Sequence, residues 1–191
     1  MSRSIIICGI GGQGTVLAAK VISRAALMAG EKVLSAETIG MAQRGGPVTS
    51  HVRIGEDAFS PLVPKGGADI MIAFEACEAV RNIGYLSPSS VVIVSRTVIQ
   101  SVMSSLAGKS FRAEEMISAL EGRAGRVVAV DTDSVCGKLG SAKVANMVLL
   151  GAACREGLFR LEDVDAAMKK LVKADFYELN KKALNLELTT D

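Results

Sequence analysis

The chain has 191 residues, of which 49% are hydrophobic and 22% are charged; this composition is typical of one soluble globular domain and excludes a disordered segment. Its 22 basic and 20 acidic residues leave a formal charge of +2, which excludes the strongly basic surface that nucleic-acid binding requires. The longest uncharged stretch, 5–19, contains four glycines and is shorter than the ~20 apolar residues of a membrane span, so a cytoplasmic protein is expected.

The chain opens with a strand, a helix and a second strand. Residues 4–8 form a short apolar run rich in isoleucine, which is typical of a buried strand. Helical spacing of apolar residues follows Gly14 and stops at Gly30, as helices often do at a glycine. Residues 32–37 predict the second strand, which completes a β-α-β unit. Residues 38–46, with three glycines and no periodicity, predict a loop.

The next segment alternates between two kinds of side chain. One face carries Val48, Ser50, Val52 and Ile54, and the other carries Thr49, His51 and Arg53. The alternation predicts a half-exposed strand over 48–54 in antiparallel pairing, with His51 on its exposed face. Residues 55–67, which include two prolines, predict a long loop.

The rest of the chain continues to alternate strands with helices. Strands of the buried type are predicted at 69–74, 90–95 and 126–130, and helices at 75–83, 112–121, 141–156 and 161–172. The segment 141–156 is apolar almost all round, so we expect it to pack on the sheet or in a subunit interface, and a homodimer is one expectation. The whole pattern predicts one α/β domain over 1–191: a Rossmann-like, open, mostly parallel sheet with helices on both faces, whose ligand lies beyond the carboxyl ends of the strands.

A glycine-rich turn follows the first strand and opens the first helix. Its spacing is G-x-G-x-x-G, in the strand-to-helix context that this fingerprint requires. Backbone N–H groups of such a turn can approach a phosphate, and the helix N-terminus adds partial positive charge. The candidate binding residues here are Gly9, Gly11, Gly12, Gln13, Gly14 and Thr15.

Glu37 strengthens the likeness to a dinucleotide site. It ends the second predicted strand, where the acidic residue of a Rossmann fold binds a ribose hydroxyl. The turn and Glu37 by themselves would therefore predict a nicotinamide or flavin site. The alternative is that the glycines only permit a tight turn between strand and helix.

A second cluster lies in the loop 38–46, at the same predicted edge of the sheet. Its candidate residues are Gln43, Arg44, Gly45 and Gly46. Arg44 could bind a phosphate or a carboxylate through its fork of donors. The alternative is an ordinary surface arginine in a glycine-rich loop.

The remaining reactive side chains predict no catalytic residue and no metal site. His51, the only histidine, has no Cys or Ser partner close to it in the sequence. Glu75 opens a helix near the ligand edge, where a carboxylate more often stabilises the helix start than contacts a ligand. The four cysteines have neither zinc nor iron–sulfur spacing and predict buried, reduced thiols in the cytoplasm: Cys8, Cys77, Cys136 and Cys154.

Two stretches taken together resemble a known family. The sequences GIGGQGT (9–15) and AETIGMAQRGGPVTSHVR (36–53) are similar to the gamma-type subunit of the 2-oxoacid:ferredoxin oxidoreductases. This family includes pyruvate, 2-oxoglutarate and ketoisovalerate synthases and the beta subunit of indolepyruvate oxidoreductase. The resemblance continues at 60–64, 67–69, 74–76, 85–88 and 145–151. Ser89-Ser90, where glycines are expected, and Ser95-Arg96, where an asparagine is common, depart from the family pattern.

The resemblance implies one subunit of an enzyme that oxidatively decarboxylates a 2-oxo acid to its acyl-CoA. Thiamine diphosphate and the iron–sulfur clusters would belong to partner subunits, coenzyme A would be a co-substrate, and this chain would bind no cofactor tightly and have no catalytic residue. Its partners would be the thiamine-binding and ferredoxin-like subunits, with ferredoxin as electron acceptor. The glycine turn and the loop from Gln43 to Gly46 would face the ligand or the partner subunit.

Two hypotheses of different classes follow. The first is the non-catalytic oxidoreductase subunit that the resemblance implies. The second is a stand-alone NAD- or nucleotide-binding Rossmann protein, which the glycine spacing and Glu37 suggest. The sequence does not distinguish among indolepyruvate, pyruvate, ketoisovalerate and 2-oxoglutarate as substrate.

Overall fold

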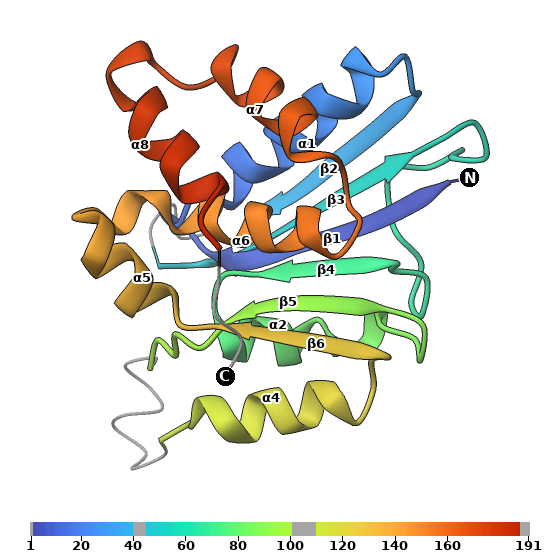
Figure 1. Ribbon diagram of the computed structural model, residues 1–191. Helices are drawn as coiled ribbons and strands as arrows, with labels where there is room; N and C mark the ends of the chain where they lie inside the picture. Colours follow the sequence, from blue (N-terminus) through green and yellow to red (C-terminus); the bar gives the residue numbers. More distant parts are fainter. Residues whose placement is uncertain (1, 40–44, 101–109, 188–191) are drawn as a thin grey trace.

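The computed structural model describes residues 2–39, 45–100 and 110–187 (Figure 1). Its strands form one six-stranded sheet: β1 (Arg3–Ile10), β2 (Val33–Ile39), β3 (Pro47–Ile54), β4 (Ile70–Ala73), β5 (Val91–Ser95) and β6 (Arg126–Val130). Its helices are α1 (Thr15–Met28), α2 (Ala76–Arg81), α4 (Ala113–Glu121), α5 (Thr132–Leu139), α6 (Ala145–Arg155), α7 (Leu161–Lys169) and α8 (Ala174–Leu184), with short 3-10 turns at Ile83–Tyr85 and Ala142–Val144.

The strands lie in the order β2-β3-β1-β4-β5-β6. The strand β3 is antiparallel to both of its neighbours, and the other five strands share one direction. The predicted open, mostly parallel sheet and the antiparallel pairing of residues 48–54 are therefore confirmed. The opening β-α-β unit is present as β1-α1-β2, but β3 lies between its two strands, whereas in a Rossmann unit they are neighbours.

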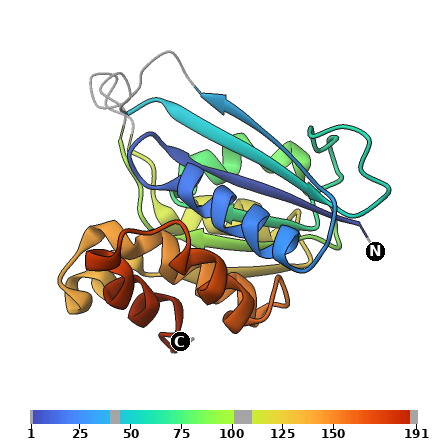
Figure 2. The ribbon, with the colours of Figure 1, turned by 90° about the horizontal axis from the view of Figure 1, so that it is seen from above.

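Helices cover both faces of the sheet, as predicted (Figure 2). One face packs against α1, α6, α7 and α8, and the other against α2 and α4. The two cores alternate along β1, because successive side chains of a strand point to opposite faces: Ile5 and Ile7 belong to the first core, Ile6 and Cys8 to the second. Among the described residues, none of the helices has both the length and the apolar character needed to cross a bilayer.

The bounds of several elements differ from those that periodicity predicts. The strand β1 extends to Ile10, so Gly9 lies inside the strand, opposite Val48 of β3, rather than in the turn. The helices α5 and α8 were not predicted individually. Each is short and polar on its outer face, with only two or three buried positions, so its apolar periodicity is weak.

The apolar segment near residue 150 is an internal helix. All residues of α6 from Asn146 to Cys154 are buried, because α6 packs on β4 and β5 and is covered by α8. Of the two predicted roles, packing on the sheet is the observed one. The apolar surface of α6 is satisfied within the chain, so the expectation of self-association through this helix is wrong.

Candidate functional site

The glycine turn joins the carboxyl end of β1 to the start of α1. Gly12 and Gly14 have φ angles of 104° and 87°, a left-handed backbone region that glycine adopts without steric cost. Gly14 is the N-cap of α1, and neither a side-chain cap nor a first-turn carboxylate accompanies it. The partial positive charge of this helix start is therefore not neutralised by its own first turn.

Close packing around Gly9 leaves no room for a side chain. A Cβ atom at this position would lie 2.7 Å from Gln13 Oε1, 2.8 Å from Phe74 Cβ and 2.9 Å from Thr15 Cγ2. These distances are too short for a real side chain. Gly9 and the buried Thr15 thus belong to the interior beneath the turn.

Gln13 holds the turn against the neighbouring strand. Its Oε1 accepts a hydrogen bond from the N–H of Ile10 at 2.7 Å, and its Nε2 donates to the carbonyl of Phe74 at 3.2 Å. Phe74 directly follows β4, and β1 and β4 are neighbours whose following helices lie on opposite faces. The crevice between them is the topological switch point where open α/β folds bind ligands, and Gln13 spans it.

The two glycine motifs meet in space. The N–H of Gly11 donates to the carbonyl of Gly46 at 2.8 Å, and the N–H of Gly45 donates to the carbonyl of Gly11 at 3.4 Å. Gly45, like Gly12, is exposed, has a positive φ and faces open space. Gln43 and Arg44 lie outside the described residues, so their predicted roles stay predictions.

Glu37 does not lie where a ribose-binding acid would. The strand β2 ends at Ile39 rather than at Glu37, and β3 separates it from β1. Glu37 is exposed on the outermost strand, beside α1. The prediction that Glu37 complements the glycine turn is therefore wrong, because strand order is set by pairing that the local sequence does not contain.

His51 is buried, not on an exposed face as alternation predicted. It is only 4% exposed, because the loop that follows β3 folds back over it. Its Nδ1 accepts a hydrogen bond from the N–H of Val63 at 3.2 Å, and its ring stacks edge-on against Tyr85 at 5.4 Å. Burial, with a smaller contribution from Lys65, lowers the pKa of His51.

Glu75 stabilises the start of a helix, which is the role that its sequence position predicts. It is the N-cap of α2 and is 1% exposed. Its carboxylate accepts hydrogen bonds from the N–H of Glu78 at 2.7 Å and from the N–H of Ile99 at 2.9 Å. Both oxygens are thus used to tie α2 to the segment after β5.

A cluster of hydroxyl side chains that the sequence does not predict lies at the same edge of the sheet. Ser95 Oγ lies 2.6 Å from Thr132 Oγ1, and Thr97 Oγ1 donates to Asp133 Oδ2 at 3.1 Å. The cluster links the carboxyl ends of β5 and β6, which are neighbouring strands in Figure 1. Its only signal in the sequence is that hydroxyl residues lie at or just after the ends of two strands, Ser95 at the end of β5 and Thr132 two residues after β6.

The cysteines do not form a reactive centre. Burial raises the pKa of the Cys77 and Cys154 thiols to about 11 and also raises the pKa of Cys8 and Cys136. Thiols so shifted stay protonated near neutral pH, and a thiolate is the form that binds metal. Within the described ranges, no three metal-ligating side chains of His, Cys, Asp or Glu lie together, so these residues do not fit an iron–sulfur cluster.

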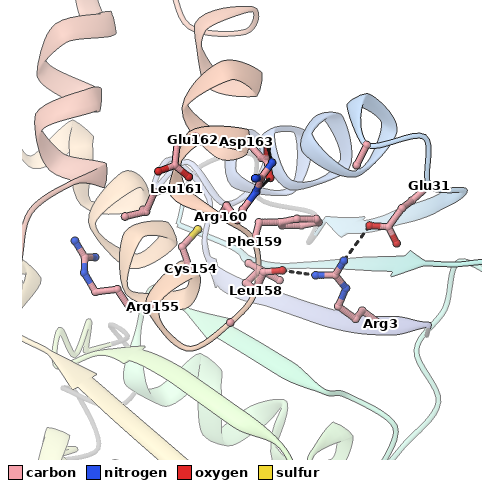
Figure 3. Close-up of a pocket in the computed structure, with 12 residues that line it drawn as sticks. Arg3, Glu31, Cys154, Arg155, Leu158, Phe159, Arg160, Leu161, Glu162 and Asp163 are labelled. Carbon is pink, nitrogen blue, oxygen red and sulfur yellow. Dashed lines mark hydrogen bonds and ion pairs between the residues drawn. The ribbon is translucent and has the colours of Figure 1, made fainter.

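A pocket of about 640 Å³ lies at the opposite edge of the sheet (Figure 3). Arg3 forms part of its wall, with its guanidinium 4.5 Å from the ring centre of Phe159 and an ion pair of 2.9 Å to Glu31. Arg160 forms two hydrogen bonds to Asp163. The side chains of Arg3 and Arg160 are thus already neutralised by acidic partners within the pocket wall. This pocket is also separate from the glycine turn, which lies at the other end of the strands.

The carboxyl edge of the sheet that carries the glycine turn and Gly45-Gly46 is here called the glycine edge. A second pocket, of about 430 Å³, flanks it. Its apolar wall includes Leu17 of the first turn of α1 and Phe176 of α8, and its charged lining residues are Lys143 and Lys173. The edge thus combines exposed glycine backbone, a helix N-terminus and a lysine-rimmed hollow.

The chain matches a known protein family over nearly its whole length. The family model described as pyruvate ferredoxin/flavodoxin oxidoreductase matches residues 4–187. The chain is 39% identical to indolepyruvate oxidoreductase subunit IorB of Archaeoglobus fulgidus, over 97% of this chain and 94% of that protein. It is 26% identical to the common gamma subunit of the pyruvate/ketoisovalerate oxidoreductases of Pyrococcus abyssi, over 92% of this chain and 89% of that one.

Solved structures share the fold. Pyruvate oxidoreductase subunit PORC of Thermotoga maritima superposes with a TM-score of 0.70 at 23% identity, over 96% of this chain and 93% of that chain. The 2-oxoglutarate:ferredoxin oxidoreductase of Magnetococcus marinus, solved with 2-oxoglutarate, coenzyme A and succinyl-CoA, matches with a TM-score of 0.70 at 19% identity, over 96% of this chain and 30% of that chain. The sheet with its inserted antiparallel strand, the paired glycine motifs and these matches agree: this chain belongs to the pyruvate ferredoxin/flavodoxin oxidoreductase family, as a subunit of the 2-oxoacid:ferredoxin oxidoreductase group.

Proposed function

We propose that this chain is the non-catalytic gamma-type subunit of a thiamine diphosphate-dependent enzyme that converts a 2-oxo acid to its acyl-CoA and passes the electrons to ferredoxin. In this proposal residues 1–191 act as one domain that docks on the thiamine-binding subunit through the glycine edge. The observation that supports it most is the bonding of Gly11 to Gly46, because it joins the two motifs of the family resemblance into one surface.

The glycine edge offers backbone and shape rather than reactive side chains. Gly12 and Gly45 leave open space at the surface, and the uncapped start of α1 favours an approaching anionic group. The side chains of Gln13 and Thr15 serve the interior, so we assign the contacts to the backbone of Gly11, Gly12 and Gly45 and to Gln43 and Arg44. Such a surface would shape the approach of the substrate or of the phosphate-bearing coenzyme A.

The lysine-rimmed pocket gives a docking subunit a hollow to fill. Apolar side chains, among them Leu17 and Phe176, form most of its lining, and Lys143 and Lys173 add positive charge. Half of the Phe176 surface is exposed in the free chain, and burying it would favour association. An interface here would lie beside the glycine turn.

The cofactors of the reaction belong, in this proposal, to the partner subunits. Thiamine diphosphate supplies the carbanion chemistry and iron–sulfur clusters carry the electrons, whereas the four cysteines of this chain are free and protonated. Reduced thiols also favour the cytoplasm as the place of action. The ferredoxin-like subunit and ferredoxin would complete the assembly.

Indolepyruvate is the first substrate to test. Four relatives named indolepyruvate oxidoreductase subunit are 33% to 39% identical to this chain, whereas those named pyruvate/ketoisovalerate subunit are 24% to 26% identical. Because a substrate pocket next to thiamine diphosphate would lie in the partner subunit, this preference is a proposal about the assembled enzyme.

Purification of the native complex tests the function. We expect the tagged chain to retain a thiamine-binding and a ferredoxin-like subunit, and the complex to reduce ferredoxin with one of the four 2-oxo acids. Arg44→Ala should weaken the complex or lower its activity at least about tenfold, equal to ~1.4 kcal/mol. Arg123→Ala, an exposed arginine at the opposite edge, is the matched control and should change neither.

Two results would count against the proposal. A tagged chain that retains no thiamine-binding protein contradicts the subunit function itself. Full activity of Arg44→Ala would leave the function standing and remove Arg44 from the site.

A further inference from the structure

The strand β2, one of the two outer strands of the sheet, has an unpaired edge. In the described part of the chain, β2 pairs with β3 on one side and with nothing on the other (Figures 1 and 2). Natural proteins usually protect such edges with charges, prolines or bulges, because free N–H and C=O groups recruit other strands. The seven residues of β2 contain no proline and one charge, Glu37.

The register of β2 identifies the backbone groups that point outward. The N–H of Gly55 donates to the carbonyl of Lys32 at 2.9 Å, so Lys32 is opposite Gly55 and bonds inward. In an antiparallel ladder the N–H and C=O of one residue point to the same side, and the side alternates along the strand. The free groups of β2 therefore belong to Val33, Ser35 and Glu37.

A charged groove lies beside this edge. It has a volume of about 250 Å³ and runs between α1 and β2, with Arg24 and Leu27 on one wall and Ser35 and Glu37 on the other. Leu27 is 53% exposed, and Arg24 and Glu37 are also exposed. No ion pair between Arg24 and Glu37 is present among the described contacts, so each charge is available to a neighbour.

We propose that β2 pairs in antiparallel fashion with β2 of a second copy of this chain, so that the sheet continues across a two-fold axis. Outward residues must face outward residues, and the register with Ser35 opposite Ser35 places Val33 opposite Glu37 without opposing like charges. This pairing keeps both α1 helices on the same face of the joined sheet.

The two-fold axis also makes the groove self-complementary. The helix α1 runs back from the carboxyl edge of the sheet while β2 runs toward it, so Glu37 and Leu27 lie at opposite ends of the groove. Antiparallel pairing then brings Glu37 of one copy toward Leu27 and Arg24 of the other. The same surface carries both halves of the contact, as a two-fold interface requires, and this favours a second copy over an unrelated strand.

The first test removes one outward hydrogen-bond donor. Ser35→Pro deletes the outward N–H of Ser35 while leaving the inward bonds of β2 to β3, and edge strands tolerate proline. We expect the wild-type chain to sediment as a dimer and the variant to dissociate at least about tenfold more readily. Circular dichroism and thermal unfolding verify that the variant is folded.

The second test exchanges the charges. Lys20 also lines the groove, so Arg24→Glu leaves two acidic side chains and one basic one there, and Glu37→Arg leaves three basic ones. In a homodimer of either variant the residues at positions 24 and 37 would oppose like charges across the two-fold axis, so each variant should be monomeric alone. An equimolar mixture should form a heterodimer, and the double variant should regain the homodimer. This result does not depend on Ser35→Pro, so it decides the matter if that variant fails to fold.

Three outcomes overturn the proposal. The first is a wild-type chain that stays monomeric at the highest concentration the protein tolerates. The second is a dimer that neither Ser35→Pro nor the charge exchange affects. The third is a monomeric chain whose docking on another subunit is lost in Ser35→Pro, which would assign the edge to a different protein. None of these depends on the oxidoreductase activity.

Discussion

At the scale of single residues, Gln13 shows how a side chain of a predicted ligand site can also stabilise the fold. As part of a glycine fingerprint it is a possible donor to a phosphate. In the fold its oxygen accepts from Ile10 and its nitrogen donates to Phe74, so both ends of the amide serve the protein itself. The amide of Gln13 is half-buried and is held at both its oxygen and its nitrogen, which fixes the shape of the turn and suits a surface that must keep its shape for docking.

The packing around Gly9 predicts a large effect of one methyl group. Gly9→Ala would place a Cβ within 2.9 Å of three side chains, and such overpacking costs about 1–3 kcal/mol. The measurement is the free energy of unfolding in urea. Gly137→Ala in α5, where a Cβ meets nothing within 4 Å, should instead stabilise the chain by about 0.5–1 kcal/mol. Equal stability of both variants would contradict this account of Gly9.

Burial of His51 predicts a loss of stability in acid. The pKa of His51 is lowered in the fold, so the unfolded chain binds a proton at this imidazole more readily than the folded chain does. The free energy of unfolding therefore has its full His51 contribution above a pH of about 6.5, the ordinary pKa of histidine, and decreases as the pH falls below that value. Protonation also ends the bond that Nδ1 accepts from Val63.

His51→Asn tests this, with unfolding midpoints measured between about pH 5 and pH 8. The wild type should lose stability relative to the variant on acidification, by at most about 1.4 kcal/mol per pH unit. Glu78, whose pKa burial raises, changes stability in the opposite direction in both proteins. Only the difference between them therefore reports on His51, and parallel curves would contradict the prediction.

At the scale of elements, the position of β3 between β2 and β1 changes the role of β2. Because β3 separates β2 from β1, β2 becomes an outer strand instead of the wall of a nucleotide crevice. Because α8 covers α6, the apolar helix α6, buried from Asn146 to Cys154, is interior rather than an interface. Local patterns predict both elements correctly, but their roles follow from what lies beside them.

The contact between α6 and α8 depends on Gly151. A Cβ there would collide with the carbonyl oxygen of Leu184 at the end of α8, so Gly151→Ala should cost about 1–3 kcal/mol. Amide hydrogen exchange should become faster in α8 before the rest of the sheet is affected. Gly122→Ala, where the nearest atom to a Cβ is 3.6 Å away, is the matched control and should leave exchange in α8 unchanged.

At the scale of the whole molecule, the chain has the architecture of a dinucleotide-binding fold without its ligand geometry. The switch point lies between β1 and β4, where Gln13 spans the crevice, and Glu37 lies on the far edge of the sheet. In the described part of this edge, a side chain of the chain itself thus bridges the ends of β1 and β4, the place where a Rossmann protein binds its ligand.

This geometry predicts that the isolated chain does not bind dinucleotides. Titration with NAD or FAD in a calorimeter should give no saturable heat, because Glu37, the acid expected to bind a ribose, lies on β2 and is separated from the glycine turn by β3. Micromolar binding that Gly11→Val abolishes would contradict the prediction and revive the stand-alone nucleotide-binding protein.

Local sequence determines some features of the fold and the site, and distant contacts determine others. The buried strands, the turn after β1 and the helix-start role of Glu75 all follow from local patterns of apolar and polar residues. The burial of His51 could not be predicted, because a loop twelve residues further on supplies its cover. The hydroxyl cluster of Ser95 and Thr132 could not be predicted either, since it forms only where the ends of two separate strands meet.

The sequence by itself determined that this is a glycine-rich, nearly neutral α/β protein with two motifs of one oxidoreductase family. Periodicity and turn chemistry are local properties, so they can be read along the chain. Only the tertiary structure decided that the two glycine motifs bond to each other, that Gln13 links the turn to the end of β4 and that β2 has a free edge in the described part of the chain. These depend on strand order and on contacts between distant residues, which pairing and packing set and local sequence does not.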